Sequence, residues 1–179
     1  MKNIVVLIGS PRKGGNTDLL STSFINGARD SGNKVEVIYA ANVNVHPCLG
    51  CNKCQTNGGI CVIKDDMQEI YKTLSKSDII VVATPLYFYG VSAQLKAIID
   101  RLHNPIRHTF NTKSLILLSV CADKEKEAFD GLIAEFKSTL KFFSLKNGGV
   151  IIVPSVKEKG EIKGNSALDE AYNLGYSLT

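Results

Sequence analysis

The sequence predicts an α/β fold in which five parallel strands form one sheet with helices on both faces. Three observations support this prediction. Apolar, strand-like runs alternate five times with amphipathic helical segments along the 179 residues, a pattern typical of parallel sheets joined by helical crossovers. The run 79–83 is apolar throughout, as expected of a strand buried on both faces. A glycine-rich segment at 9–17 directly follows the first apolar run.

The first half of the chain contains three predicted strands. Residues 4–8 form the first, and apolar residues at helical spacing then predict a helix that ends near Gly32. A second strand is expected at 35–39, followed by a polar, cysteine-bearing connection at 41–64. Asp65 or Asp66 caps the next helix, which leads to the third strand at 79–83. The loop 84–90 precedes a helix at 92–102.

The second half continues the alternation. Residues 103–112 are expected to be irregular. They are followed by a strand at 114–120, a helix at 128–140, a strand at 150–153 and a last helix from about Ser166 to Thr179. A chain of this length is expected to fold as a single domain, residues 1–179. The strand order expected is 2-1-3-4-5, that of flavodoxin-like folds. Ligands of such sheets bind at the carboxyl ends of the strands, which points to the loops 9–17, 84–90 and 119–124.

Composition excludes several classes of protein. The formal net charge is only +4, and the lysines are spread out, so no nucleic-acid partner is expected. The chain starts directly with a strand and has no apolar run near the roughly 20 residues of a membrane span, so we expect a cytoplasmic protein without membrane contact. Five cysteines in such a protein do not indicate disulfides.

The segment Gly9–Thr17 has the features of a phosphate-binding loop. It connects a buried strand to a helix, whose first N–H groups are unpaired and favour an anion. Ser10 and Thr17 offer hydroxyl groups, Asn16 offers an amide, and Arg12 or Lys13 offers a cation. The Lys-Ser/Thr pair of a triphosphate loop and the glycine pattern of a dinucleotide loop are both missing, so a single terminal phosphate fits best. The alternative is an ordinary turn with Asn16 or Thr17 as helix cap.

The loop after the third strand carries three consecutive aromatic residues. Tyr87, Phe88 and Tyr89 would be costly to expose unless something covers them. A flat heteroaromatic ring stacked beside Pro85 and Leu86 would do so, and so would a dimer interface. A phosphate site and a ring site at adjacent strand ends describe a mononucleotide, of which FMN fits best and an adenine nucleotide is an alternative. Ser119 and Cys121 would approach the far side of the ring, although Cys121 also fits a small buried apolar residue.

Four cysteines fall within 14 residues, at Cys48, Cys51, Cys54 and Cys61. The spacing C-x2-C-x2-C-x6-C allows three thiolates to converge, and Gly58 and Gly59 allow the chain to fold back with a fourth. Structural zinc usually uses two separated C-x2-C pairs, whereas a compact three-plus-one run is closer to iron–sulfur ligation. The spacing alone does not distinguish between one 4Fe-4S cluster, a zinc site and a loop of metal-free thiols.

The motifs together resemble a known family. Gly-Ser-Pro-Arg-x-x-x-Asn-Thr at 9–17 is similar to NAD(P)H-dependent FMN reductases and flavodoxin-like quinone oxidoreductases. The cysteine run and Thr84-Pro85-Leu86-Tyr87 resemble the iron–sulfur flavoproteins of anaerobes, and the likeness covers about residues 3–155. The resemblance implies bound FMN, with Ser10, Arg12, Asn16 and Thr17 on the phosphate and Pro85, Leu86, Tyr87 and Phe88 along the isoalloxazine. It also implies dimers or tetramers, and it matches Cys48, Cys51, Cys54 and Cys61 to the cluster cysteines.

Three functions are compatible with these patterns. The first is an enzyme in which NAD(P)H, bound transiently in the open cleft, reduces FMN, and the electrons pass to a quinone, a flavin or another small acceptor. The second is a relay in which ferredoxin feeds a 4Fe-4S cluster and then FMN. The third is a non-enzymatic carrier or redox sensor, which the basic charge disfavours because such carriers are generally acidic. No catalytic side chain is expected, because the flavin performs the redox chemistry.

Overall fold

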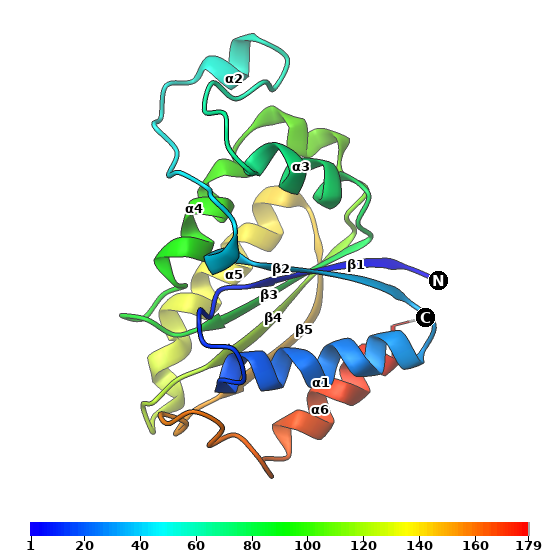
Figure 1. The fold of residues 1–179 in the computed structure, drawn as a ribbon, viewed down its shortest axis with the longest axis vertical. Helices are drawn as coiled ribbons and strands as arrows, with labels where there is room; N and C mark the ends of the chain where they lie inside the picture. The colour runs from blue at the N-terminus through cyan, green and yellow to red at the C-terminus, as the bar shows by residue number, and fades with distance from the viewer. Residues whose placement is uncertain (179) are drawn as a thin grey trace.

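The computed structural model of the chain describes residues 1–178 (Figure 1). Its centre is a five-stranded, all-parallel sheet of order β2-β1-β3-β4-β5, which confirms the predicted order. The strands are β1 (Asn3–Ile8), β2 (Lys34–Tyr39), β3 (Ile79–Pro85), β4 (Ser114–Val120) and β5 (Lys146–Val153). β1 and β3 are neighbours, and the strands that follow each of them are added on opposite sides, β2 beside β1 and β4 beside β3. The loops at the carboxyl ends of β1 and β3 therefore turn away from each other and leave a crevice between them.

Helices cover both faces of the sheet. On one face lie α1 (Asn16–Asp30) and α6 (Ala167–Tyr176), and on the other lie α3 (Met67–Ser75), α4 (Ala93–Arg101) and α5 (Asp130–Phe143). Each face has its own apolar core, one centred on Phe24 and Val81 and the other on Phe129 and Leu117. The short elements are α2 (Lys53–Thr56) and 3-10 turns at Ala40–Asn42, Pro105–Thr109 and Lys126–Phe129.

The strand that differs most from the prediction is β5, which begins four residues before the expected Val150. Glycine-containing sequence at 146–149 resembles a loop, but these residues pair with β4 beside an irregularity at Leu115 and Ile116. A Cβ atom at Gly148 would lie 2.7 Å from Cγ1 of Ile116, so only glycine allows this close pairing. The 3-10 turn at Pro105–Thr109 likewise lies in the stretch expected to be irregular.

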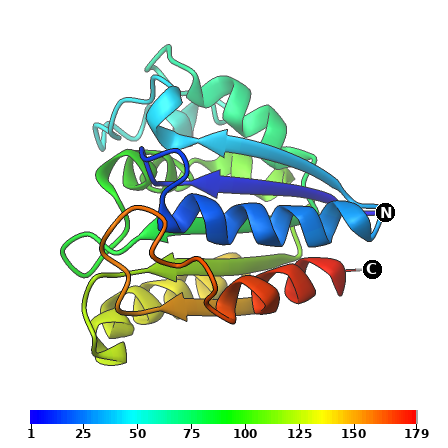
Figure 2. The ribbon, with the colours of Figure 1, turned by 60° about the horizontal axis from the view of Figure 1, so that its bottom comes forward.

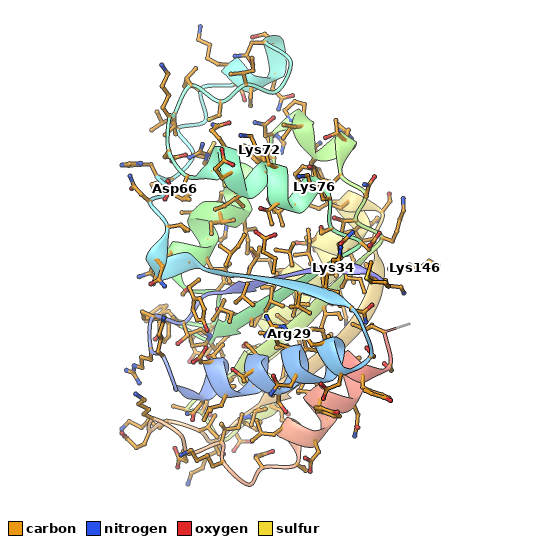
Figure 3. The ribbon with its side chains drawn as sticks, turned by 45° about the vertical axis from the view of Figure 1, so that its right-hand side comes forward. Arg29, Lys34, Asp66, Lys72, Lys76 and Lys146 are labelled. Carbon is orange, nitrogen blue, oxygen red and sulfur yellow. The ribbon has the colours of Figure 1, made fainter. Side chains whose placement is uncertain are left out.

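The amino ends and the carboxyl ends of the strands carry different residues. Lys34 and Lys146 mark the amino ends of β2 and β5 (Figure 3), and the three loops predicted to carry the chemistry leave from the opposite, carboxyl edge. The last helix starts at Ala167, close to its expected position, and ends at Tyr176; the expected end at Thr179 lies outside the described residues. No helix of residues 1–178 is both long and apolar enough to cross a membrane.

Candidate active site

The three loops predicted to carry chemistry meet in one cavity of about 250 Å³ at the carboxyl edge of β1, β3 and β4. The segment between β5 and α6 also reaches this cavity, lying beside the loop that follows β1 (Figure 2). The lining residues come from all four segments: Ser10, Arg12, Gly15, Asn16, Thr17, Pro85, Leu86, Tyr87, Val120, Cys121, Ala122, Val156, Lys157 and Lys159.

The loop after β1 is fixed against the start of α4. Oγ of Ser92 donates to the carbonyl oxygen of Gly9 at 2.8 Å. A side chain at position 9 would clash with this contact, because its Cβ would lie 2.7 Å from the same Oγ. The N–H of Ser92 donates in turn to Oγ1 of Thr84 at 3.2 Å. Glycine at position 9 is therefore required by this close approach, which ties the first loop to the third.

The start of α1 presents free donors to the cavity. The helix cap is Gly15, with no side-chain capping bond, so neither Asn16 nor Thr17 is the cap. No acceptor within residues 1–178 meets the backbone N–H groups of Asn16, Thr17 or Asp18. The Asp18 carboxylate accepts from the N–H of Gly14 at 2.7 Å, which holds the loop in place. Unpaired N–H groups at a helix N-terminus, with the Arg12 side chain beside them, fit a phosphate monoester.

The Asn16 side chain has a different role from the phosphate contact expected of it. Its Nδ2 donates to the carbonyl oxygen of Glu158 at 2.9 Å, and its Oδ1 accepts from the N–H of Ile162 at 3.2 Å. The amide therefore holds the segment between β5 and α6, and Asn16 keeps only its backbone N–H for a phosphate. The same contact brings Lys157 and Lys159 into the lining. Sequence reasoning missed both lysines, and the only signal was their place in a charged loop after the last strand.

The aromatic loop forms a tight hairpin. Tyr87 and Gly90 exchange two backbone hydrogen bonds, at 3.0 and 3.1 Å, and Phe88 and Tyr89 both have positive φ, at 51° and 67°. Tyr87 lines the cavity, whereas the Phe88 side chain is fully exposed at the tip. The N–H of Leu86 donates to Val120, so the amides left for the polar edge of a ring are those of Phe88 and Tyr89.

The end of β4 supplies one wall of the cavity. Cys121 lines it and is 5% exposed, and burial raises the pKa of its thiol. These properties fit an apolar packing role for Cys121. Ser119 is fully buried and donates to the carbonyl oxygen of Thr84 at 2.9 Å, which joins β4 to β3 instead of opening toward the cavity. Pro85 and Leu86 form the wall between β3 and the hairpin.

The cysteine segment lies away from this cavity, beyond α3 and around α2 (Figure 1). Cys48 and Cys51 are exposed, and Cys54 and Cys61 are half-buried. Within residues 1–178, no three potential metal-ligating side chains come close enough together to hold an ion. Local bonds shape each part of the segment separately, such as the 3.4 Å contact from the Gly50 N–H to Sγ of Cys48. The predicted convergence of the four thiols is therefore absent from this structure.

A buried ion pair holds the base of the cysteine segment. Arg101, 2% exposed at the end of α4, donates from Nη1 to Oδ2 of Asp65 at 2.6 Å and to the carbonyl oxygen of His46 at 3.2 Å. Burial opposes ionisation of Asp65, but the bonds from Arg101 and from two backbone N–H groups hold the pKa of that carboxyl below its usual value. Nε and Nη2 of Arg101 are buried without a partner among the described residues. The sequence predicted only that Asp65 or Asp66 caps a helix, because nothing in the spacing of Asp65 and Arg101 reveals a pair 36 positions apart.

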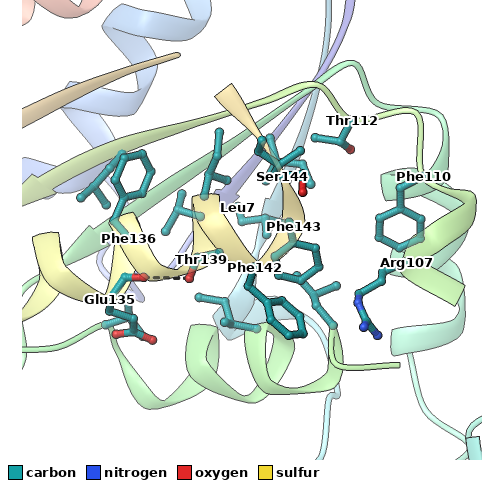
Figure 4. Close-up of a pocket in the computed structure, with 18 of the residues that line it drawn as sticks. Leu7, Arg107, Phe110, Thr112, Glu135, Phe136, Thr139, Phe142, Phe143 and Ser144 are labelled. Atoms are coloured by element: carbon teal, nitrogen blue, oxygen red, sulfur yellow. Dashed lines mark hydrogen bonds between the residues drawn. The ribbon is translucent and has the colours of Figure 1, made fainter. Parts of the chain in front are cut away.

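A second, larger cavity of about 360 Å³ lies between α4, α5 and the sheet. Phe110, Phe136, Phe142 and Phe143 surround it, with Arg107 at one side (Figure 4). The Arg107 guanidinium lies 5.0 Å from the ring centre of Phe142, which is a cation–π distance. None of the three chemistry-bearing loops lines this cavity, so it is separate from the candidate active site.

The chain matches a protein family and individual relatives. The model of the family described as NADPH-dependent FMN reductase matches residues 2–153. An iron–sulfur flavoprotein of Methanocaldococcus jannaschii is 40% identical over 113 residues, which cover 63% of this chain and 58% of that protein. YwqN of Bacillus subtilis, which is named "putative NAD(P)H-dependent FMN-containing oxidoreductase", is 26% identical over 179 residues, covering 96% of this chain and 95% of that protein. The match to the first three curated relatives, all iron–sulfur flavoproteins, spans about half of their length.

Solved structures share the fold. An NAD(P)H:quinone oxidoreductase of Methanothermobacter marburgensis superimposes with a TM-score of 0.77 at 16% identity, over 99% of both chains. An FMN-dependent NADH-azoreductase of Bacillus anthracis, solved in complex with FMN, has a TM-score of 0.71 at 12% identity, over 98% of both chains. Such low identities show a common fold alone. Because the family match extends over most of the chain, from residue 2 to 153, the chain belongs to the NADPH-dependent FMN reductase family.

Proposed function

We propose that this protein binds FMN in the cavity at the carboxyl edge of the sheet and uses it to transfer electrons from NAD(P)H to a quinone, a flavin or another small acceptor. One observation carries the proposal. Free N–H groups at the start of α1, the Arg12 side chain and the hairpin residue Tyr87 border the same cavity of about 250 Å³. A phosphate site and a ring site are thus combined at the crevice where open α/β sheets bind ligands.

Each part of the chain has a definite task in this proposal. The N–H groups of Asn16, Thr17 and Asp18, with Arg12, hold the phosphate, and the buried Ser10 and Thr17 hydroxyls border the same place. Pro85, Leu86 and Tyr87 form the wall for the ring, and the N–H groups of Phe88 and Tyr89 are free to meet its polar edge. Cys121 and Val120 fill the far wall and exclude water from it.

The chemistry supplied by bound FMN is acceptance of a hydride from NAD(P)H and passage of both electrons to the acceptor. With a quinone acceptor, one further proton from water completes the quinol, and NAD(P)⁺ is released. The protein would contribute orientation, since transfer is fast only when the reacting atoms are held about 3–3.5 Å apart. The proposal assigns no acid or base role to a side chain of the lining, because the cofactor would carry the redox chemistry.

A relay from ferredoxin through a 4Fe-4S cluster is the second candidate. The names of the relatives and the spacing of Cys48, Cys51, Cys54 and Cys61 favour it. The thiols as they stand do not form a ligand set, so we derive no step through a cluster. We also propose a homodimer or tetramer, because Phe88, Tyr89 and Phe142 expose large aromatic surfaces that a second copy would cover.

The experiment that tests the proposal is reconstitution followed by reduction. Purified protein is titrated with FMN, and the flavin-loaded protein is then mixed with NADH or NADPH without oxygen. Saturable binding of one FMN per chain and rapid loss of the oxidised flavin absorbance support the proposal, and turnover with added quinone or flavin identifies the acceptor class. Absence of FMN binding contradicts it. If anaerobically purified protein contains stoichiometric iron and sulfide and its flavin responds only to a ferredoxin, the relay replaces the reductase.

A further inference from the structure

We propose that the cavity between α4, α5 and the sheet, which we call the α4–α5 cavity, binds a small aromatic carboxylate whose charged group pairs with Arg107. The cavity has a volume of about 360 Å³ and is lined by residues of the sheet, of α4, of the turn Pro105–Thr109 and of α5. None of the three loops of the candidate active site lines it. A ligand in this cavity therefore leaves the FMN site open.

The floor of the α4–α5 cavity is apolar and lies deep in the molecule. It includes Leu7, Val82 and Leu117, which belong to the core of this face of the sheet and are 1%, 9% and 1% exposed. Protein interiors are close-packed, with few voids larger than a water molecule. Ligand sites, in contrast, are concave, mostly apolar and about 300–1,000 Å³ in volume. The α4–α5 cavity thus has the size and the lining of a ligand site.

The rim of the cavity is bridged by contacts between the connection after α4 and the end of α5. The Arg107 guanidinium lies 5.0 Å from the ring centre of Phe142 and 5.9 Å from that of Phe143. The ring of His103 stacks on Phe142, with the ring centres 6.2 Å apart. These contacts narrow the way to the floor for a segment of another protein, whereas a flat small molecule needs less room. The geometry therefore favours a small ligand over a second copy of the chain.

Arg107 supplies the charge that a carboxylate needs. Its Nη1 donates to the carbonyl oxygen of His103 at 2.6 Å, and no carboxylate of residues 1–178 pairs with it. A guanidinium presents a planar fork of donors that matches a carboxylate. One such group balances the single charge of a carboxylate, whereas a phosphate monoester carries about −1.5 to −2. The ligand that fits this charge is a monoanion.

The acidic residue of the lining lies away from Arg107. Glu135 is on α5, seven positions before Phe142, which corresponds to about 10 Å along a helix. Figure 4 shows Glu135 and Arg107 on opposite sides of the cavity. His108, which also lines the cavity, belongs to the same turn as Arg107. A carboxylate bound at Arg107 is therefore not opposed by Glu135 at close range.

The volume and the rings around the cavity define the rest of the ligand. A water molecule takes about 30 Å³ in the liquid, so the cavity has room for about a dozen non-hydrogen atoms. Four phenylalanines surround it, Phe110, Phe136, Phe142 and Phe143. Aromatic rings in offset or edge-to-face contact gain more than their burial alone provides, and a rigid ring loses less freedom on binding than a flexible chain. A two-ring carboxylate of the naphthoate type fits these properties.

The test is a titration with two probes of the same size and shape, of which only one is charged. Calorimetry measures the binding of 2-naphthoate and of its neutral counterpart 2-naphthamide to the purified chain, with and without saturating FMN. We expect one naphthoate per chain, bound about 10-fold to 100-fold more tightly than the amide and unaffected by FMN. Decanoate, an aliphatic carboxylate of similar size, should bind more weakly. The titration without FMN makes this test independent of the proposed function.

Three variants locate the probe. Arg107→Gln should abolish the preference for naphthoate and leave the affinity for naphthamide within about twofold of wild type. Thr139→Phe, at a half-buried lining position on α5, fills part of the cavity and should weaken both probes about 10-fold or more. Lys141→Gln is the matched control, because Lys141 is an exposed cation of α5 outside the lining, and it should keep both affinities. Circular dichroism shows that each variant is folded.

Several results would overturn the proposal. Wild type that binds neither probe would do so, including the case in which a second copy of the chain closes the cavity. Equal affinities of wild type for naphthoate and naphthamide would remove the role of charge, and tighter binding of decanoate would remove the aromatic class. Displacement of naphthoate by FMN would place the probe in the other cavity. An unchanged preference in Arg107→Gln would remove Arg107 from the site.

Discussion

The loop after β1 and the cysteine segment differ in how far the folded chain has prepared them for a ligand. The loop is held by Ser92, Asp18 and the Asn16 contacts, and it leaves N–H groups free at one cavity. The cysteine segment is held at its base by the buried Asp65–Arg101 pair, whereas Cys48 and Cys51 farther along it are exposed. The comparison shows that residues able to bind a ligand form a preformed site only where contacts from other elements fix their backbone.

The largest expected effect concerns the base of the cysteine segment. Replacing Arg101 with leucine leaves the buried Asp65 carboxylate without its partner, and we expect the free energy of unfolding to fall by about 3–5 kcal/mol. Urea denaturation followed by circular dichroism measures this. The double variant Arg101→Leu/Asp65→Leu should recover much of the loss, and equal instability of the single and double variants would argue against an ion pair as the stabilising contact.

The next effect concerns cofactor affinity at the loop after β1. Arg12→Gln should raise the FMN dissociation constant about 10-fold to 100-fold, because one charge-assisted bond to the phosphate is lost. Its stability should change little, since Arg12 is exposed. Lys53→Gln, in the cysteine segment, is the control and should leave flavin affinity unaltered in a fluorescence titration. An Arg12 variant with wild-type affinity would remove Arg12 from the phosphate site.

A smaller effect is expected where the loop meets α4. Gly9→Ala would bring a Cβ atom within 2.7 Å of Oγ of Ser92 and 2.9 Å of Cδ2 of Leu95, and such overpacking costs about 1–3 kcal/mol. Both thermal stability and FMN affinity should decrease. Gly90→Ala is the matched control, because its Cβ would have no neighbour closer than 4.0 Å. Wild-type behaviour of Gly9→Ala would show that the contact with α4 is not needed.

The smallest stability effect is a dependence on pH. The pKa of the Asp65 carboxyl is lowered in the folded protein, so its contribution to stability is present above the usual carboxyl range and is lost as the pH falls through it. The difference in unfolding free energy between wild type and Asp65→Asn should therefore shrink as the pH falls from about 6 to 3. Asp100 forms a surface ion pair with Lys96, and Asp100→Asn should differ little from wild type in unfolding free energy at every pH. If the difference in unfolding free energy between wild type and Asp65→Asn does not change with pH, the pKa of Asp65 is not lowered by folding.

Particular residues show what could be predicted from the sequence. The alternation of strands and helices followed from hydrophobic patterning, because buried strands and amphipathic helices have distinct periods. The strand order and the three loops followed from the fit of five such units, with a phosphate loop after the first strand, to the flavodoxin-like order. Ser10, Arg12, Thr17, Pro85, Leu86, Tyr87 and Cys121 come together as cavity lining because the carboxyl ends of neighbouring parallel strands share one edge. The side-chain role of Asn16, the pair Asp65–Arg101 and the lysines of the β5–α6 segment were missed, since each depends on contacts between residues far apart in the sequence.

The most direct test of the central claim compares flavin binding with and without the cysteines. Wild type and a variant in which Cys48, Cys51, Cys54 and Cys61 are all serine are each titrated with FMN under the same conditions. If the cofactor site is the preformed cavity at the carboxyl edge of β1 and β3, both proteins bind one FMN per chain with dissociation constants within about twofold of each other. Failure of wild type to bind FMN, or loss of binding in the four-serine variant alone, would contradict the account.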